Sequence, residues 1–193
     1  VVPLARVQIT FRCGSITQQK ENAGLFHLYE HMLFKGNEVY RTQSDFKAAM
    51  KELGVGEWNG GTSTEFVTYY LTIPSSKLEQ GLEFWSNAVR FPLLDPQELE
   101  TEKEVVINEI QGYLNNPDRI NGAAIDARLY HAYPWRRDVT GNSETIAGAA
   151  VEDMEYIKNT FYVPNNCAIL VSGDVRPQEV LSYVETYFGD WIP

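Results

Sequence analysis

The chain has 193 residues, of which 44% are hydrophobic and 22% charged, which is the composition of a globular protein with enough apolar side chains for a sizeable core. Its formal net charge of −10 argues against non-specific nucleic-acid binding, because nucleic-acid phosphates would repel it. No apolar run approaches the length of roughly 18 residues that a membrane-spanning helix needs.

The chain begins with Val1 rather than an initiator methionine, and a strand pattern follows at once. We therefore expect a fragment of a larger protein, so a leader sequence could precede it and the compartment stays open. No change in composition divides the sequence, and we expect residues 1–193 to form one domain. The two cysteines, Cys13 and Cys167, make no metal-type pair, and two buried free thiols or one disulfide both fit the sequence.

The first part of the chain predicts a strand, two helices and two further strands. Residues 5–13 alternate between apolar and polar side chains, as in a half-buried strand. A helix is predicted over residues 25–35, and a second helix runs from Ser44, its N-cap, to Gly54. Residues 55–74 are rich in β-formers around a polar, glycine-containing turn, which predicts two paired strands.

The rest of the chain is predicted to be mostly helical. A helix is expected over 75–92, with Leu78, Leu82, Trp85 and Val89 on one stripe. A helix of about five turns follows, with Asp95 as N-cap and Pro96 at its first position. The remaining elements expected in chain order are a helix over 119–133, one short and one longer helix within 143–162, a buried strand over 166–174 and a helix over 176–189. This order predicts an α+β fold, with helices packed on one face of a mostly antiparallel sheet.

Two of the three histidines lie in the segment "HLYEH", one helical turn apart. Residues at positions i, i+3 and i+4 share a helix face, so His27, Glu30 and His31 point the same way. Two imidazoles in this arrangement can hold one Zn²⁺ at about 2.0–2.1 Å, and H-x-x-E-H is the reverse of the common zinc helix. The alternative is a pair of hydrogen-bonded core histidines, although a pair with an adjacent glutamate fits a metal helix better.

A catalytic zinc site needs a third protein ligand, and "ETEKEVVINEI" offers candidates. Glu102 and Glu109 are seven residues apart, so they project from nearly the same face of one helix. Ile107 and Ile110 flank Glu109, which argues against a fully solvated carboxylate there. A buried carboxylate is costly unless it is paired or bound to a metal.

These segments together resemble the pitrilysin/insulysin family of zinc peptidases, the inverzincins, which includes the mitochondrial processing peptidases. The family pattern is H-x-x-E-H, then 70–80 residues, then E-x6-E, and here Glu109 follows His31 by 78 residues (109 − 31). The stretch "WNGGTSTEFVTYY" resembles the family's N-A-x-T-S-x-E-x-T-x-Y-Y, with Gly60 in place of the common Ala and Thr68 shifted by one position. The segments "DVTGNSETI" and "YVPNNCAILVSGDV" also resemble the family, so the likeness covers essentially the whole chain.

The resemblance implies a metallohydrolase half-domain fold and a role for each matching residue. His27, His31 and Glu109 would hold one Zn²⁺ per chain, and Glu30 would be the general base that deprotonates the zinc-bound water. Glu102 would be a supporting residue near the zinc. Asn59 would contact the substrate at an edge strand, with an ordinary polar turn residue as the equal alternative.

The function implied is that of a metalloendopeptidase domain acting on short or unfolded polypeptides. Family members build the active chamber from two similar halves, and this chain matches only the first, so the second half-domain is expected on the same chain or on a partner subunit. Without it, the chain should bind zinc but cleave peptides poorly. The alternative is a catalytically silent structural or binding homologue, although the four motif positions of ligands and base are intact.

Two further expectations concern aromatic residues and the third histidine. Trp58, Trp85 and Trp135 should pack in or near the core. His131 has no zinc spacing to the other two histidines, which favours a surface or capping role.

Overall fold

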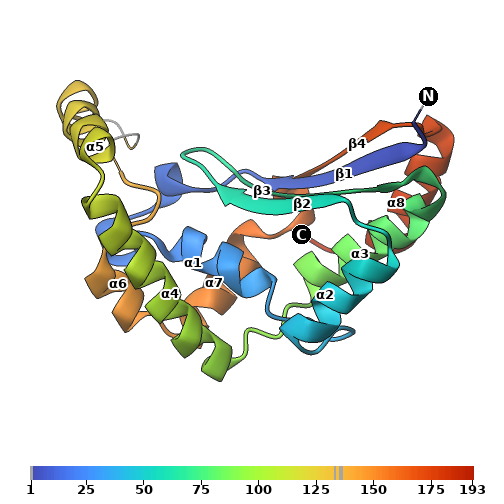
Figure 1. Ribbon diagram of the computed structural model, residues 1–193, viewed down its shortest axis with the longest axis horizontal. Helices are drawn as coiled ribbons and strands as arrows, with labels where there is room; N and C mark the ends of the chain where they lie inside the picture. Colours follow the sequence, from blue (N-terminus) through green and yellow to red (C-terminus); the bar gives the residue numbers. More distant parts are fainter. Residues whose placement is uncertain (1, 133, 135–136) are drawn as a thin grey trace.

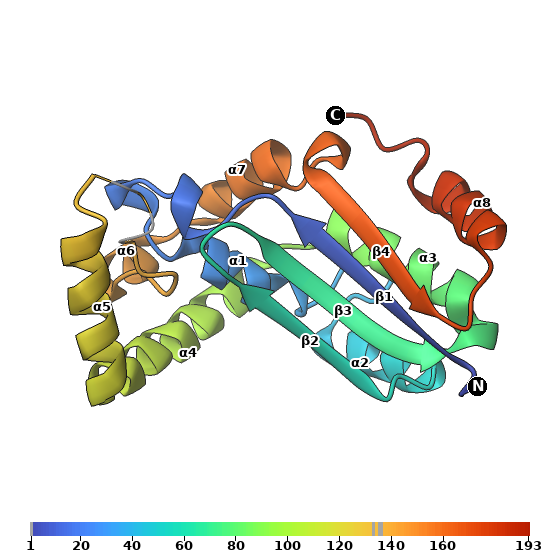
Figure 2. The same cartoon turned by 90° about the horizontal axis from the view of Figure 1, so that it is seen from above.

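A computed structural model of the chain describes residues 2–132, 134 and 137–193. Its sheet has four strands in the order β2-β3-β1-β4, and every neighbouring pair is antiparallel. The strands are β1 (Leu4–Phe11), β2 (Glu57–Thr62), β3 (Val67–Pro74) and β4 (Cys167–Gly173). Figure 2 shows the two outer strands β2 and β4 at opposite sides of the sheet, with β1 and β3 between them.

The described residues contain eight α-helices, most of which lie under one face of the sheet (Figure 1). The predicted α+β class with helices on an antiparallel sheet is therefore confirmed. The helices are α1 (Leu25–Leu33), α2 (Gln43–Glu52), α3 (Leu78–Arg90), α4 (Pro96–Leu114), α5 (Pro117–Leu129), α6 (Ser143–Gly148), α7 (Val151–Phe161) and α8 (Pro177–Phe188). None of the helices in the described part of the chain combines the length and apolarity needed to cross a membrane.

The core lies between the sheet and the helices, as the alternation of the strands requires. Every second residue of β1 and β3 is completely buried: Ala5, Val7, Ile9 and Phe11 in β1, and Val67, Tyr69, Leu71 and Ile73 in β3. The predicted stripe of α3 packs against this layer, and its four members are at most 4% exposed. Burial of this kind stabilises a fold by about 1.5–3 kcal/mol for each large apolar side chain.

The helix α4 begins where its sequence predicts. The carboxylate of Asp95 accepts hydrogen bonds from the amides of Gln97 and Glu98 at 2.8 and 3.0 Å, and Pro96 occupies the first helical position. The helix ends at Leu114 and is capped by Asn115. This straight element carries both predicted glutamates past α1.

Ser44 was predicted as the N-cap of the second helix, and that prediction is wrong. α2 is capped two residues earlier by Thr42, whose backbone is extended. The Thr42 hydroxyl accepts from the amide of Asp45 at 3.1 Å, and Asp45 in turn accepts from the amide of Thr42 at 3.2 Å. This reciprocal pair satisfies two amides at once, which a cap at Ser44 does not offer.

The strand over residues 166–174 was predicted to be buried, and only one of its faces is covered. Leu170, on the outer face of β4, is 52% exposed, whereas Ile169 and Val171 pack partly against the core. β4 is an edge strand and the helices cover the other face of the sheet, so a purely apolar run does not require burial on both faces here.

The aromatic and cysteine predictions have mixed outcomes. Trp85 is completely buried, whereas Trp58 on the edge strand β2 is 40% exposed and packs against Phe34 with ring centroids 5.2 Å apart, so Trp58 lies near the core rather than in it. Trp135 lies outside the described residues. Cys13 and Cys167 are both free, and burial raises the pKa of each thiol to about 12.

Candidate metal centre

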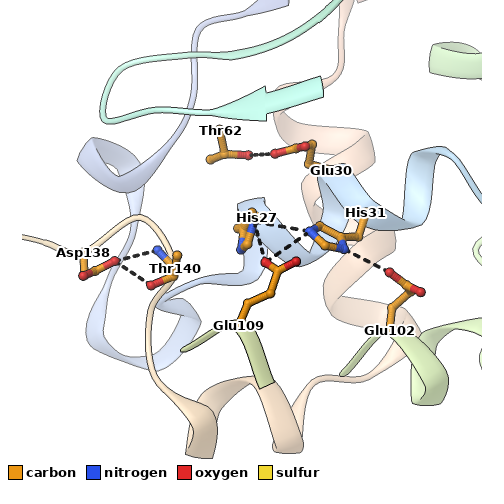
Figure 3. A network of polar contacts seen from close by, with 8 residues as sticks. All are labelled: His27, Glu30, His31, Thr62, Glu102, Glu109, Asp138 and Thr140. Atoms are coloured by element: carbon orange, nitrogen blue, oxygen red, sulfur yellow. Dashed lines mark hydrogen bonds and ion pairs between the residues drawn. The ribbon is translucent and has the colours of Figure 1, made fainter. Parts of the chain in front are cut away.

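The helix α1 carries three of the predicted site residues on one side and core residues on the other. Its buried face includes Leu28, Tyr29 and Met32, each at most 1% exposed. His27 and His31 face α4 instead, where Glu109 approaches them (Figure 3). The amphipathic pattern of α1 thus turns both imidazoles toward the same neighbouring helix.

The ligand atoms of His27, His31 and Glu109 converge. The two imidazole Nε2 atoms are 3.3 Å apart, and Glu109 Oε2 lies 3.7 Å from that of His27 and 3.8 Å from that of His31. Within the described ranges, these three residues are the only group of three potential metal ligands with ligand atoms within 4.8 Å of one another. The structure therefore brings together the three residues predicted as ligands.

This geometry fits a tetrahedral zinc ion. Ligand atoms at about 2.0–2.1 Å from Zn²⁺ lie about 3.3–3.4 Å from each other at tetrahedral angles, which matches the separation of the two Nε2 atoms. Glu109 is slightly farther away, and its side chain is 37% exposed, so it has room to move inward. The exposure also leaves an open side for a fourth ligand.

The charge state of His27 suits a ligand. Burial, followed by the neighbouring His31, lowers the pKa of His27 to about 4, so the imidazole is neutral near pH 7 and has a lone pair to offer. Its other ring nitrogen, Nδ1, is buried without a hydrogen-bond partner. A neutral His27 that binds metal through Nε2 carries its proton on Nδ1.

His31 is held through its second ring nitrogen. Glu102 Oε2 lies 3.0 Å from His31 Nδ1, and Glu102 is only 5% exposed. Burial acts to lower the pKa of His31, but the hydrogen bond to Glu102 and the charges of Glu109 and Glu30 raise it above the usual histidine value. The carboxyl groups of Glu30, Glu102 and Glu109 thus surround His31, and negative groups of this kind favour a divalent cation.

Glu30, the predicted base, is 8% exposed and lies beside the ligands. Burial raises the pKa of its carboxyl group, and a hydrogen bond from Thr62 partly offsets that effect. The Thr62 hydroxyl donates to Glu30 Oε2 at 2.8 Å from the edge strand β2. β2 therefore meets the site through this contact as well as through Gly60, which lies against Glu30.

Asn59 lies on the other face of β2. Successive residues of a strand point to opposite faces, so Asn59 points away from the face that carries Gly60 and Thr62. Its side-chain oxygen accepts from the amide of Gly60 at 3.0 Å, and the residue is exposed. Its predicted contact with substrate stays a prediction.

Two residues near the site had no role in the sequence-based prediction. Thr62 belongs to the quoted family stretch, but a sequence pattern does not show that its hydroxyl reaches Glu30. Lys35 forms an ion pair with Glu102, and its position four residues after His31 was the available signal. His131, in contrast, is exposed beyond the end of α5 and outside the ligand group.

Two family models cover nearly the whole chain. Residues 2–142 match Insulinase (Peptidase family M16), and residues 149–193 match Peptidase M16 inactive domain. All predicted site residues fall within the first match. The strand β4 of the second match pairs with β1 of the first, so both matched segments contribute to one sheet.

Relatives of similar sequence are zinc proteases and processing peptidases. A probable mitochondrial-processing peptidase β subunit from Arabidopsis thaliana is 26% identical, over 95% of this chain and 34% of the relative. An uncharacterized zinc protease from Mycobacterium leprae is 28% identical, over 96% of this chain and 41% of the relative. The chain thus spans less than half the length of either relative.

Solved structures share the fold. A protease from Helicobacter pylori superposes with a TM-score of 0.92 at 23% identity, over 98% of this chain and 46% of the other. Pitrilysin superposes with a TM-score of 0.82 at 22% identity, over 97% of this chain and 20% of its own. Both are proteases that contain more than twice the matched length.

Proposed function

Because the chain belongs to the insulinase family of peptidases, peptidase family M16, we propose that residues 1–193 form the zinc-bearing domain of a metalloendopeptidase built from two halves. The observation that carries this proposal is the convergence of two imidazoles and a carboxylate, with ligand atoms 3.3–3.8 Å apart, beside a buried glutamate. His27, His31 and Glu109 would hold one zinc ion, with Glu102 supporting His31.

Each residue then has a chemical task. The chemistry that a bound zinc ion would supply here is polarisation of the scissile carbonyl and a lowering of the pKa of a water molecule toward about 7. Glu30 takes a proton from the attacking water and passes it to the leaving amine, and its raised pKa suits both steps. Thr62 holds the Glu30 carboxylate in place through the hydrogen bond that its hydroxyl donates to Oε2.

The edge strand β2 is the proposed place of the substrate. Among the described strands, β2 is paired only with β3, so its other edge can accept an extended peptide as a further strand. Main-chain hydrogen bonds of this kind do not depend on side chains, which favours short or unfolded polypeptides of varied sequence. Asn59, exposed on this strand, is the proposed side-chain contact.

A metal assay tests the first part of the proposal. The purified chain should contain about one zinc ion, and Glu109→Ala should sharply reduce that content, as measured by elemental analysis of both proteins side by side. If both proteins stay free of metal after zinc is supplied, the histidines are core residues of a scaffold, and the peptidase proposal fails.

A substitution of the base tests the second part. Glu30→Gln keeps the size of the side chain and removes its basicity, so this variant should retain zinc and lose peptide cleavage, assayed with the second half-domain present. Unchanged cleavage would reject Glu30 as the base. Zinc binding by the unaltered chain without any cleavage would favour the catalytically silent homologue instead.

A further inference from the structure

The carboxylate of Glu102 is shared between two partners. Its Oε2 lies 3.0 Å from His31 Nδ1, and its Oε1 forms an ion pair with Lys35 Nζ. The side chains of Lys35 and Glu102 are only 14% and 6% exposed, so water competes little for either group. His31 Nε2, at the far side of the same ring, faces His27 and Glu109.

The position of Lys35 follows from the end of α1. The chain keeps a helical turn beyond the last residue of the helix, because the Lys35 amide donates to the carbonyl of Met32 at 3.0 Å. Lys35 therefore lies one turn after His31 on the same side, facing α4. His31 and Lys35, one turn apart, thus both face Glu102.

We propose that Lys35 is a positioning residue of the metal centre: it holds the Glu102 carboxylate in the orientation that keeps the proton of His31 on Nδ1 and directs Nε2 toward the metal. The proposal rests on the proposed function. A ligand histidine acquires a fixed tautomer and ring orientation when its other nitrogen donates to a carboxylate. Without Lys35, Glu102 would be a buried carboxylate with an unpaired oxygen, free to turn away from His31.

Substitution of Lys35 tests this role through metal affinity. Zinc affinity of the 193-residue chain is measured by competition with a chelating dye, and the visible spectrum of the cobalt-loaded chain reports ligand geometry. Lys35→Met should weaken zinc binding by about 10- to 100-fold, as substitutions of groups that orient metal ligands do. The cobalt spectrum should change as well.

Lys103→Met is the matched control. The Lys103 side chain is 9% exposed and forms an ion pair at 2.5 Å with Glu100, whose side chain is 71% exposed, so Lys103→Met removes an ion pair that involves neither Glu102 nor a proposed ligand. Its zinc affinity should stay within about twofold of the unaltered chain. Equal losses in Lys35→Met and Lys103→Met would overturn the proposal, because they would show a general cost of removing a largely buried lysine.

A double substitution tests whether Lys35 acts through Glu102. In a Glu102→Gln background, Lys35→Met should cause little further loss of zinc affinity, because residues that act through one contact are not additive. Full additivity would overturn the proposal. Lys35→Arg should bind zinc more tightly than Lys35→Met, and an arginine variant as weak as the methionine variant would show that the charge is not what matters.

Folding of the variants and zinc binding by the unaltered chain are measured as controls. Circular dichroism checks that each variant is folded, and Lys35→Gln replaces Lys35→Met in the same comparison if the latter does not fold. The unaltered chain separates the two hypotheses: if it binds no zinc, the proposed function fails, whereas zinc binding that is insensitive to Lys35 rejects only the present inference.

Discussion

At the scale of single residues, the hydroxyl of Thr62 should be important for catalysis by Glu30, the proposed general base. Thr62→Val removes the 2.8 Å hydrogen bond to Glu30 and keeps the shape of the side chain. Because a hydrogen bond to a charged group contributes about 1.5–3 kcal/mol, we expect kcat/KM to fall by about 10- to 100-fold while zinc content is unchanged. The measurement is cleavage of a quenched fluorescent peptide with the second half-domain present.

Thr68→Val is the matched control for this prediction. Thr68 lies in the neighbouring strand β3, where its hydroxyl is 2.8 Å from that of Thr10, on the face away from Glu30. It loses comparable bonds at a distance from the site, so its kcat/KM should be nearly that of the unaltered protein. A similar loss in both variants would contradict a specific role for Thr62.

Gly60 is a second residue on which the site depends. A Cβ atom there would lie 2.8 Å from the Phe34 ring and 2.9 Å from Glu30 Oε1. Phe34 has little room to yield, because it packs against three other rings: Phe46, Trp58 and Tyr69. We expect Gly60→Ala to lower the free energy of unfolding by about 1–3 kcal/mol, measured by urea denaturation, and to slow cleavage.

The adjacent Gly61 offers a control within the same strand. A Cβ atom at Gly61 meets nothing within 4 Å. Gly61→Ala should therefore leave the free energy of unfolding unchanged or raise it by up to about 1 kcal/mol, because alanine reduces the conformational entropy of the unfolded chain. If Gly61→Ala destabilised the protein as much as Gly60→Ala, the crowding argument would be wrong.

At the scale of elements, the metal should act as a link between two helices. His27 and His31 lie on α1 and Glu109 on α4, so a bound ion joins segments that are 78 residues apart (109 − 31). A ligand present at 100 times its Kd stabilises the folded state by about 2.7 kcal/mol. For a chain of this size we expect zinc to raise Tm by about 5–10 °C over the chelated protein, as followed by circular dichroism.

Glu109→Ala tests whether this link involves α4. Zinc should change the Tm of that variant little, because the ion would then contact α1 alone. A shift as large as that of the unaltered chain would mean that zinc binds elsewhere or is held without α4.

Elements also show what the sequence could and could not predict. The helix α4 was predicted from Asp95 and Pro96, because a cap and a first-turn proline are local signals. Thr42 was missed as a cap because Ser44 carries the same kind of hydroxyl, and only the reciprocal bond with Asp45 decides between them. Burial of β4 was overestimated, because its edge position is a property of the assembled sheet.

In the candidate site too, local features were predictable from the sequence and contacts between distant segments were not. The spacing of His27, Glu30 and His31 within one helix fixed their common face in advance, and the E-x6-E pattern pointed to Glu109. Contacts between distant segments were not predictable in this way. Thr62 reaches Glu30 from 32 residues away, and Lys35 meets Glu102 across two helices.

At the scale of the whole molecule, the site is open on one side. The Glu109 side chain is 37% exposed and the outer edge of β2 is unpaired within the described residues, so this chain alone would contact a bound peptide on one side only. We expect the isolated chain to bind zinc yet cleave peptides slowly, and addition of the second half-domain to raise kcat/KM by at least about tenfold, since positioning of the substrate contributes several kcal/mol. Turnover by the isolated chain as fast as by the two-half protein would contradict this expectation.

The pairing of β1 with β4 has a consequence for where the polypeptide can be cut. A truncated chain ending at Gly148 would keep every predicted ligand, yet it would turn the central strand β1 into a bare edge and uncover Phe11, on which Tyr162 stacks at 4.0 Å. Unpaired apolar edges recruit other chains, so we expect the 1–148 fragment to scatter light as aggregates at concentrations where residues 1–193 stay monodisperse. A monodisperse, folded fragment would disprove this, whereas aggregation would mean that the first matched segment needs the second to remain a soluble monomer.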